Sequence, residues 1–193
     1  MDTFDALPGV HFRHAGLLDV PYIFTLMTDA CMNDGCFSST MLTGAGYGSL
    51  LVMLLSALHV FQGWRRRKDV RHELIVAEVD DEAVGFLHYI RYQTAQGAPQ
   101  VYIDSCAIAA AHRNHGYGNR MVEWVMDREA DGSTLITARC NHYAKAMQHI
   151  FKRHRFVRKS VGQGLESYTF GAGAAVTAPP PAPARARPTL HNA

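Results

Sequence analysis

The sequence has few of the features that direct a protein to a disulfide scaffold, a zinc site or export. Its four cysteines, Cys31, Cys36, Cys106 and Cys140, lack the paired spacing of a zinc site and are too few in 193 residues for a disulfide-dense fold. The N-terminus carries acidic residues and has no basic region followed by an apolar run, so it does not resemble a secretory signal. We therefore expect a cytoplasmic protein.

The sequence also lacks long apolar runs and a large excess of charge of one sign. The longest apolar stretch, residues 47–61, is about 15 residues long and contains His59, whereas a membrane-spanning helix needs about 20. We expect a buried helix there and no membrane partner. With 19 Lys and Arg against 17 Asp and Glu, no overall field attracts nucleic acid. The basic run Arg65–Lys68 is expected to be a solvated helix end, with contact to an anionic ligand as the alternative.

A loop with two glycines, Arg113–Gly118 (RNHGYG), lacks both the lysine of a Walker motif and the third glycine of a dinucleotide fingerprint. It lies between a β-rich run and a helical pattern. Backbone N–H groups in such a loop bind phosphate, helped by the helix dipole, and Arg113 and Arg120 can add charge-assisted hydrogen bonds. The loop alone predicts only an anion site.

Apolar periodicity predicts a mixed α/β domain over residues 1–170, followed by a disordered Ala/Pro-rich tail over 171–193. Strand, helix, strand between 101 and 140 predicts a parallel pair of strands. The expected strands are 10–14, 73–79 and 84–92 (joined by the acidic turn 80–82), 100–108, 133–140, 156–161 and 165–170. The expected helices are 17–32, 50–64, 143–154 and a stretch after the glycine loop with apolar positions Met121, Val122, Val125 and Met126.

The segment Cys106–Gly118 resembles the coenzyme A loop of the GNAT acetyltransferase superfamily. That loop has Arg or Gln, two residues, Gly, one residue, then Gly or Ala, and Arg113, Gly116 and Gly118 fill the pattern. The segment Asn141–Phe156 is similar to the family's next strand end and helix. The elements follow one another in the family's order over roughly residues 10–170.

This resemblance implies an α/β (α+β) fold with a mostly antiparallel sheet of about six to seven strands and about four helices. Splayed parallel strands would form the coenzyme A cleft. It implies acetyl-CoA as co-substrate without a metal, and transfer of the acetyl group to a primary amine of a small molecule or peptide. A non-catalytic acyl-CoA-binding sensor is the alternative function. A second copy of the chain, forming a homodimer, is a further candidate partner.

The resemblance also assigns cofactor contacts residue by residue. Backbone groups of Cys106, Ala107 and Ile108 would hold the pantetheine arm, and Asn141 would hydrogen-bond it. A backbone N–H near Ile108 would polarise the thioester carbonyl. The backbone amides of Arg113, Asn114, His115, Gly116, Tyr117, Gly118 and Asn119 would meet the pyrophosphate, and Arg120 and Phe151 are further expected cofactor contacts.

An attacking amine must lose a proton, so a base is expected near the end of the strand before the loop. Tyr102, Asp104, Cys106 and Ile108 share one face of that strand if no bulge intervenes. Asp104 is the preferred base, or the anchor of a cationic amine, with Tyr102 as the second candidate. An aspartate at a strand end also often serves only as a partner of neighbouring groups.

The chain departs from the family where a tyrosine commonly acts as the general acid, because Phe151 occupies that position and Arg155 the following glycine's. Tyr143 is the best replacement by location, and a partly buried structural tyrosine is the alternative. Cys140, His149 or solvent are other sources of the proton. We expect Cys106 and Cys140 to be small apolar residues rather than nucleophiles. His112 and His115 lie in the loop without a carboxylate or cysteine to complete a metal site.

Overall fold

The computed structural model describes residues 9–33, 70–162 and 165–171. The expected helix at 50–64, the basic run Arg65–Lys68 and all but the first residue of the Ala/Pro-rich tail lie outside the described residues.

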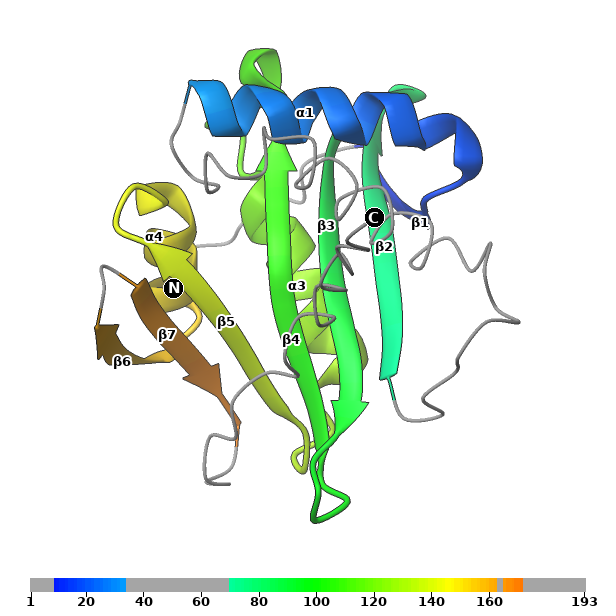
Figure 1. Cartoon of the computed structure of the whole chain (residues 1–193). Helices are drawn as coiled ribbons and strands as arrows, with labels where there is room; N and C mark the ends of the chain where they lie inside the picture. The colour runs from blue at the N-terminus through cyan, green and yellow to red at the C-terminus, as the bar shows by residue number, and fades with distance from the viewer. Residues whose placement is uncertain (1–8, 34–69, 163–164, 172–193) are drawn as a thin grey trace, which may run out of the picture.

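A seven-stranded sheet forms the centre of the molecule, in the order β1-β2-β3-β4-β5-β7-β6 (Figure 1). Neighbouring strands are antiparallel except β4 and β5, which run parallel as the sequence predicted. The strands are β1 (Val10–His14), β2 (Val70–Val79), β3 (Glu82–Gln93), β4 (Pro99–Ile108), β5 (Leu135–Asn141), β6 (Val157–Gly162) and β7 (Leu165–Phe170).

Three α-helices lie within the described residues: α1 (Val20–Met32), α3 (Tyr117–Glu129) and α4 (Lys145–Arg153). The periodic apolar residues of α3 pack with α4 against one face of the sheet. Ile23, Leu26 and Met27 of α1 pack against the other face. Figure 1 shows α1 crossing the upper ends of β2, β3 and β4, with α3 behind the sheet. The two helical layers therefore bury both faces of the central strands.

The hairpin β2–β3 turns on Asp80 and Asp81, two of the three acidic residues that predicted the turn, and the third, Glu82, begins β3. Both residues have positive φ, 50° and 64°. A two-residue loop with positive φ at both positions matches the right-handed twist of its strands, and aspartate tolerates that conformation better than most residues. The turn chemistry therefore fixes the register of the hairpin.

The parallel pair β4–β5 ends before either strand does. Pairing runs only from Gln100 opposite Leu135 to Ile103 opposite Ala138. Beyond that point β4 continues to Ile108 and β5 to Asn141, and Figure 1 shows the two strands diverging towards the end that α1 crosses. The sheet is thus open between its two central parallel strands, as the family resemblance implied.

A β-bulge in β4 lies where this divergence starts. His88 of β3 pairs with Ser105 and Tyr89 pairs with Ile103, which leaves Asp104 as the extra residue. Ile103, Cys106 and Ile108 consequently contact the same apolar cluster. The expectation that Tyr102, Asp104, Cys106 and Ile108 share one face was therefore wrong, because the bulge reverses the alternation after Asp104.

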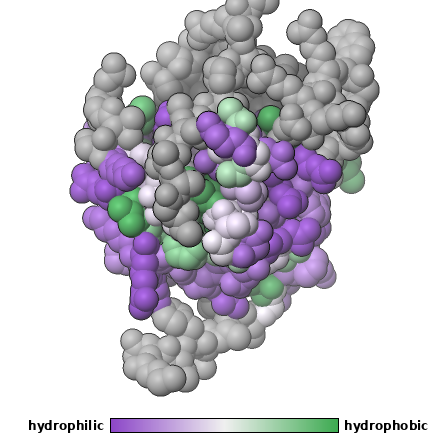
Figure 2. Space-filling view, turned by 90° about the horizontal axis from the view of Figure 1, so that it is seen from below, coloured by the Kyte–Doolittle hydropathy of each residue, from purple (hydrophilic) through white to green (hydrophobic). Residues whose placement is uncertain are grey.

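The surface seen from below the sheet is mainly hydrophilic, with apolar side chains in small separate groups (Figure 2). Among the described residues, no helix has the length and apolar character needed to cross a membrane.

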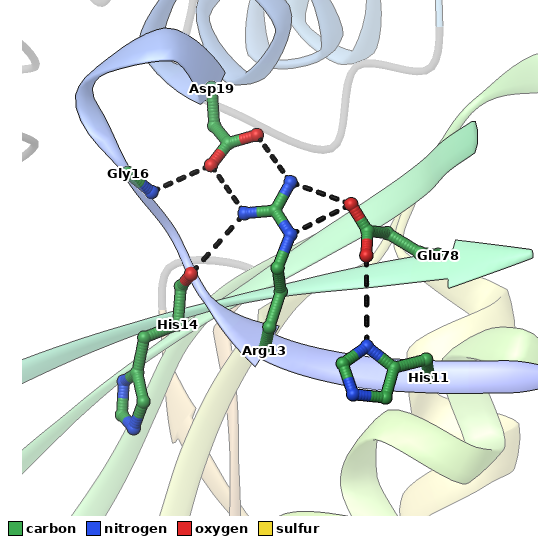
Figure 3. Close-up of polar contacts among 6 residues, drawn as sticks. All are labelled: His11, Arg13, His14, Gly16, Asp19 and Glu78. Atoms are coloured by element: carbon green, nitrogen blue, oxygen red, sulfur yellow. Dashed lines mark hydrogen bonds and ion pairs between the residues drawn. The ribbon is translucent and has the colours of Figure 1, made fainter. Parts of the chain in front are cut away.

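An arginine at the N-terminal edge joins three segments of the chain (Figure 3). The Arg13 guanidinium donates to both carboxylate oxygens of Asp19, at 2.6 and 2.8 Å, and to Glu78 at 2.7 Å. Asp19 also accepts the backbone N–H of Gly16 at 2.6 Å. The network ties β1 and β2 to the short 3-10 turn Leu17–Asp19 that leads into α1.

We expect Asp19→Asn to lower the free energy of unfolding by about 2 kcal/mol, because the partly buried Arg13 keeps its charge and loses one of its two anionic partners. Urea denaturation at neutral pH measures this change. Asp81→Asn, at an exposed turn that asparagine also tolerates, should change it by less than about 0.5 kcal/mol.

The same variant has a defined pH dependence. The Arg13 guanidinium holds the pKa of Asp19 below its usual range against the opposing effect of burial. The stabilisation is therefore present above the ordinary carboxyl pKa and is lost as pH falls through the lowered pKa of the folded state. The stability difference between the native chain and Asp19→Asn should shrink over that acidic range, and a constant difference would contradict this account.

Candidate functional site

A cavity of about 650 Å³ lies where β4 and β5 diverge. Its walls are the end of β4 from Ile103 to Ile108, the loop that leads into α3, the end of β5 from Arg139 to Asn141, and α4. Past Ile103 the edge of β4 that faces β5 has no ladder partner in β5. Unpaired strand backbone beside a cavity is a site where an extended ligand can pair with the chain.

The loop before α3 presents a helix N-terminus to this cavity. Gly116 has φ 83°, in the left-handed region that favours glycine, and it immediately precedes the first helical residue, Tyr117. The N-cap residue of α3, Gly116, makes no side-chain capping hydrogen bond in the part of the chain that the structure describes. The first amides of this 13-residue helix are therefore suited to an anion, as the sequence predicted for Gly116, Tyr117, Gly118 and Asn119.

The two arginines predicted to meet phosphate both have partners within the chain. Arg113 donates through Nε to the carbonyl of Ile108 at 3.0 Å and approaches Asp29 of α1 through Nη2 at 3.4 Å. Arg120 pairs with Glu123 at 3.1 Å. The Arg113 side chain thus fixes the loop to β4 and α1, a role that the motif did not indicate.

The end of β4 lies very close to β3 at Gly85. A Cβ atom on Gly85 would lie 2.4 Å from Cδ1 of Ile108 and 2.7 Å from the carbonyl oxygen of Ala107. Glycine at this position therefore lets β3 support the strand end whose backbone, Cys106–Ile108, was predicted to hold the pantetheine arm. Sequence reasoning missed Gly85, because a glycine inside a strand pattern indicates only a bulge or a close approach.

Asp104, the predicted base, lines the cavity and has a buried partner. Its Oδ2 lies 3.0 Å from Nδ1 of His88, whose side chain is only 1% exposed, and Nε2 of His88 lies 3.1 Å from Nδ1 of His72. Sequence reasoning missed both histidines. The only available signal was a histidine within the otherwise apolar run of β3.

Tyr102, the second candidate base, is absent from the cavity wall. Burial, with a smaller contribution from Asp104, raises the pKa of Tyr102 to about 12. Its phenolate is therefore scarce at neutral pH, so the structure favours Asp104 over Tyr102.

Tyr143 lines the cavity between β5 and α4 and is 59% exposed. The alternative of a partly buried structural tyrosine was therefore wrong. Phe151, in contrast, is 1% exposed and packs on Phe156 and Tyr168, with ring centroids 4.9 and 5.3 Å away. Phe151 forms the apolar floor of the cavity and offers no proton.

Asn141 ends β5 and starts the turn into α4. Its Oδ1 accepts the backbone N–H groups of Tyr143 and Ala144, both at 3.0 Å, and its carbonyl accepts Nε2 of Gln148 at 2.8 Å. Asparagine favours such turns because its short side chain reaches the backbone two and three residues on. Asn141 lies on the cavity wall as predicted, and its contact with pantetheine stays a prediction.

The cysteine on β4 is poorly suited to be a nucleophile. Burial raises the pKa of the Cys106 thiol to about 12, and the neighbouring Cys140 adds to this effect. A thiol that ionises so reluctantly behaves as a small apolar side chain, as expected from the sequence. Within the described part of the chain, no group of three or more potential metal ligands comes together.

The sequence matches the acetyltransferase (GNAT) family over residues 54–154. It matches none of the curated proteins. Arabidopsis thaliana Naa50, solved with the bisubstrate analogue CoA-Ac-MVNAL, is similar in structure, with a TM-score of 0.55 and 12% identity over 83% of this chain and 96% of Naa50.

Two further solved structures share the fold. RimL, the ribosomal L7/L12 alpha-N-protein acetyltransferase, solved with coenzyme A, has a TM-score of 0.62 and 12% identity over 84% of this chain and 94% of its own. The PaiA N-acetyltransferase of Thermoplasma acidophilum, also with coenzyme A, has a TM-score of 0.63 and 10% identity over 85% and 99%.

We expect Cys106 to react slowly with iodoacetamide at pH 8, at least about tenfold more slowly than free cysteine, because its raised pKa keeps it a thiol there. Timed alkylation followed by peptide mass spectrometry gives the rate. Raising the pH towards 10 should accelerate the reaction of Cys106 more than that of free cysteine, whose ionisation is then complete. Fast labelling at pH 8 would show that the thiolate is accessible and would reopen a covalent route.

Proposed function

Because the chain belongs to the acetyltransferase (GNAT) family, we propose that it transfers the acetyl group of acetyl-CoA directly to a primary amine. The observation that carries the proposal is the cavity between β4 and β5. This cavity has an uncapped helix N-terminus at one part of its wall and the Asp104 carboxylate at another.

The described residues fit the chemical parts of acetyl-CoA. The amides at the start of α3 suit its pyrophosphate, and the unpaired edge of β4 beyond Ile103 suits the amide groups of its pantetheine arm. Acetyl-CoA supplies an activated acyl group on a thiol leaving group. A backbone N–H near Ile108 is our proposed donor to the thioester oxygen, where negative charge develops during attack.

Asp104 is our proposed acceptor of the proton that the amine loses. As the new N–C bond forms and the C–S bond breaks, this proton moves to the carboxylate and the sulfur leaves as a thiolate that takes up one proton. The exposed hydroxyl of Tyr143 on the cavity wall is the proposed donor of that proton, since Phe151 has none to give. Direct transfer needs no acyl-enzyme, in keeping with the raised pKa of Cys106.

The acceptor amine is proposed to be carried by a peptide or a small molecule, with a peptide N-terminus tested first. Naa50 was solved with a peptide-containing analogue and RimL is an alpha-N-protein acetyltransferase, which supports that order. A cytoplasmic location and a homodimer remain predictions from the sequence.

A second candidate function is acyl-CoA binding without catalysis. It is favoured by Phe151, which is buried at the position where the family commonly has a tyrosine acid. Tight binding of acetyl-CoA with no release of free thiol across a panel of peptides and small amines would favour this sensor over the enzyme. Sustained thiol release with any amine would exclude it.

Gly116→Val should weaken acetyl-CoA binding by about tenfold or more, because a β-branched residue at φ 83° strains the loop that presents the α3 amides. Isothermal titration calorimetry measures the affinity. Gly132→Val is the matched control: its φ is 82°, a Cβ there meets nothing within 4 Å, and it lies outside the cavity wall. Equal affinities of the two variants would argue against the loop as the pyrophosphate site.

Asp104→Asn should lower kcat by about 100-fold while leaving the affinity for acetyl-CoA within about twofold, because asparagine keeps the shape but cannot take the amine proton. Thiol release in steady state gives kcat, and calorimetry gives the affinity. Asp127→Asn, at an exposed position of α3 outside the cavity wall, serves as control. Parallel losses of binding and turnover in the Asp104 variant would contradict its role as base.

A further inference from the structure

We propose that His88 is the positioning residue of the Asp104 carboxylate and that His72 fixes the tautomer of His88. The proposal rests on the proposed function, in which Asp104 takes the proton of the amine. It adds two residues, on β2 and β3, which the family resemblance and the cavity outline did not supply.

Three neighbouring strands bring the three side chains together. His72 lies on β2, His88 on β3 and Asp104 on β4, and the ring nitrogens and the carboxylate oxygen follow one another at 3.1 and 3.0 Å. The two imidazole rings are stacked, with centroids 5.3 Å apart and planes 11° apart. The bulge at Asp104 supplies the extra residue opposite His88 and Tyr89.

The positions of the protons in the series His72–His88–Asp104 follow from the hydrogen bonds between these residues. An ionised carboxylate can only accept, so Nδ1 of His88 must carry a proton and donate it to Oδ2 of Asp104. In a neutral ring Nε2 of His88 is then an acceptor, and Nδ1 of His72 must donate to it. Both hydrogen bonds are therefore donated in the same direction, from His72 to His88 and from His88 to Asp104.

With this direction, the two histidines hold Asp104 in place and do not carry away the proton that the amine loses. A proton that arrives on Asp104 cannot pass to Nδ1 of His88, which already holds one. What His88 does is occupy Oδ2 and fix the plane of the carboxylate, and within the described residues no hydrogen-bond partner contacts Oδ1. The orientation of the Asp104 carboxylate on the cavity wall is then set by a ring that is itself held by His72.

Burial makes the arrangement rigid. The His88 side chain is 1% exposed, whereas Asp104 is 32% exposed, so the histidine cannot meet the substrate and the aspartate can. A buried imidazole is costly unless both of its nitrogens are satisfied, and here both are. A charged side chain that must keep one orientation towards its substrate is commonly held by a hydrogen-bond partner on the side away from the substrate.

The tautomer is the first test, and it needs no turnover. In the full-length protein with ¹⁵N-labelled histidine, long-range ¹H–¹⁵N spectra near pH 8 should show His88 with its proton on Nδ1, the signals being assigned by their loss in His88→Asn. In the double variant His72→Leu with Asp104→Ala this signature should disappear, because the ring then lacks both the donor at Nε2 and the acceptor at Nδ1 that fix its tautomer. A proton on Nε2 of His88 in the unsubstituted protein, or an unchanged signature in the double variant, would overturn the proposal.

Kinetics provide the second test. His88→Leu should lower kcat by about tenfold or more and leave KM for acetyl-CoA within about twofold, because only the orientation of the base is disturbed. His88→Asn places an N–H donor where Nδ1 was and should restore kcat to within about threefold of the unsubstituted protein. His11→Asn, on an exposed side chain of β1, controls for the exchange itself.

The variants separate a positioning role from mere packing. In the Asp104→Asn background, His88→Leu should cost less than about twofold further in kcat, since the two residues act as one unit. Equal kcat values for His88→Leu and His88→Asn, or full additivity with Asp104→Asn, would overturn the proposal. If His88→Leu does not fold, the kcat of His88→Asn and the NMR measurement of the His88 tautomer test the proposal instead. If no amine is acetylated at all, the proposed function fails while the tautomer still tests the geometry.

Discussion

The premature end of the parallel pairing between β4 and β5 is the constraint on which the rest of the site depends. Two strands that stop bonding at Ile103 and Ala138 but continue beyond them leave backbone groups without their usual partners. Side chains satisfy some of these groups, as Arg113 and Gln148 do for the carbonyls of Ile108 and Asn141. The others need water or a ligand, since burying them unpaired is costly. The cavity lies at this interruption of the sheet, between the diverging strand ends and α4, with Asp104 on its wall.

Among the described residues, buried carboxylates that stabilise the fold are paired with arginines, whereas the carboxylate at the cavity is not. Asp19 is paired with Arg13, and the buried Glu129 accepts the hydroxyl of Tyr89 and pairs with Arg91 at 3.1 Å. Asp104 has a histidine but, within the described residues, no arginine or lysine. Its charge is oriented without being neutralised by a permanent cation, as a group that must hold a cationic amine or take its proton requires.

Local patterns in the sequence predicted much of the fold because they are set by neighbouring residues. The apolar spacing of α3, the acidic turn of β2–β3 and the glycines before α3 each act within a few positions, and the structure confirms these elements. The bulge at Asp104 was not predictable, because it arises from the pairing of β4 with β3 and leaves no mark in β4 alone. It displaced Cys106 from the face that alternation assigned to it.

Contacts between distant segments account for the rest of what sequence reasoning missed. His88 and Asp104 are 16 positions apart and Arg113 and Asp29 are 84 apart, and neither pair shares a motif. The exposure of Tyr143 was likewise set by how α4 packs, since the residue types around it fit a buried ring equally well. Sequence therefore located the loop and the carboxylate on the cavity wall but not the groups behind them.

Two contacts of Arg113 link the loop before α3 to β4 and to α1. Its guanidinium is shared between the carbonyl of Ile108 and Asp29 of α1. A pyrophosphate that recruits this side chain must compete with Asp29, so occupancy of the loop and the clamping of α1 are thermodynamically coupled. By reciprocity, any molecule that draws Asp29 away from Arg113 strengthens anion binding at the loop.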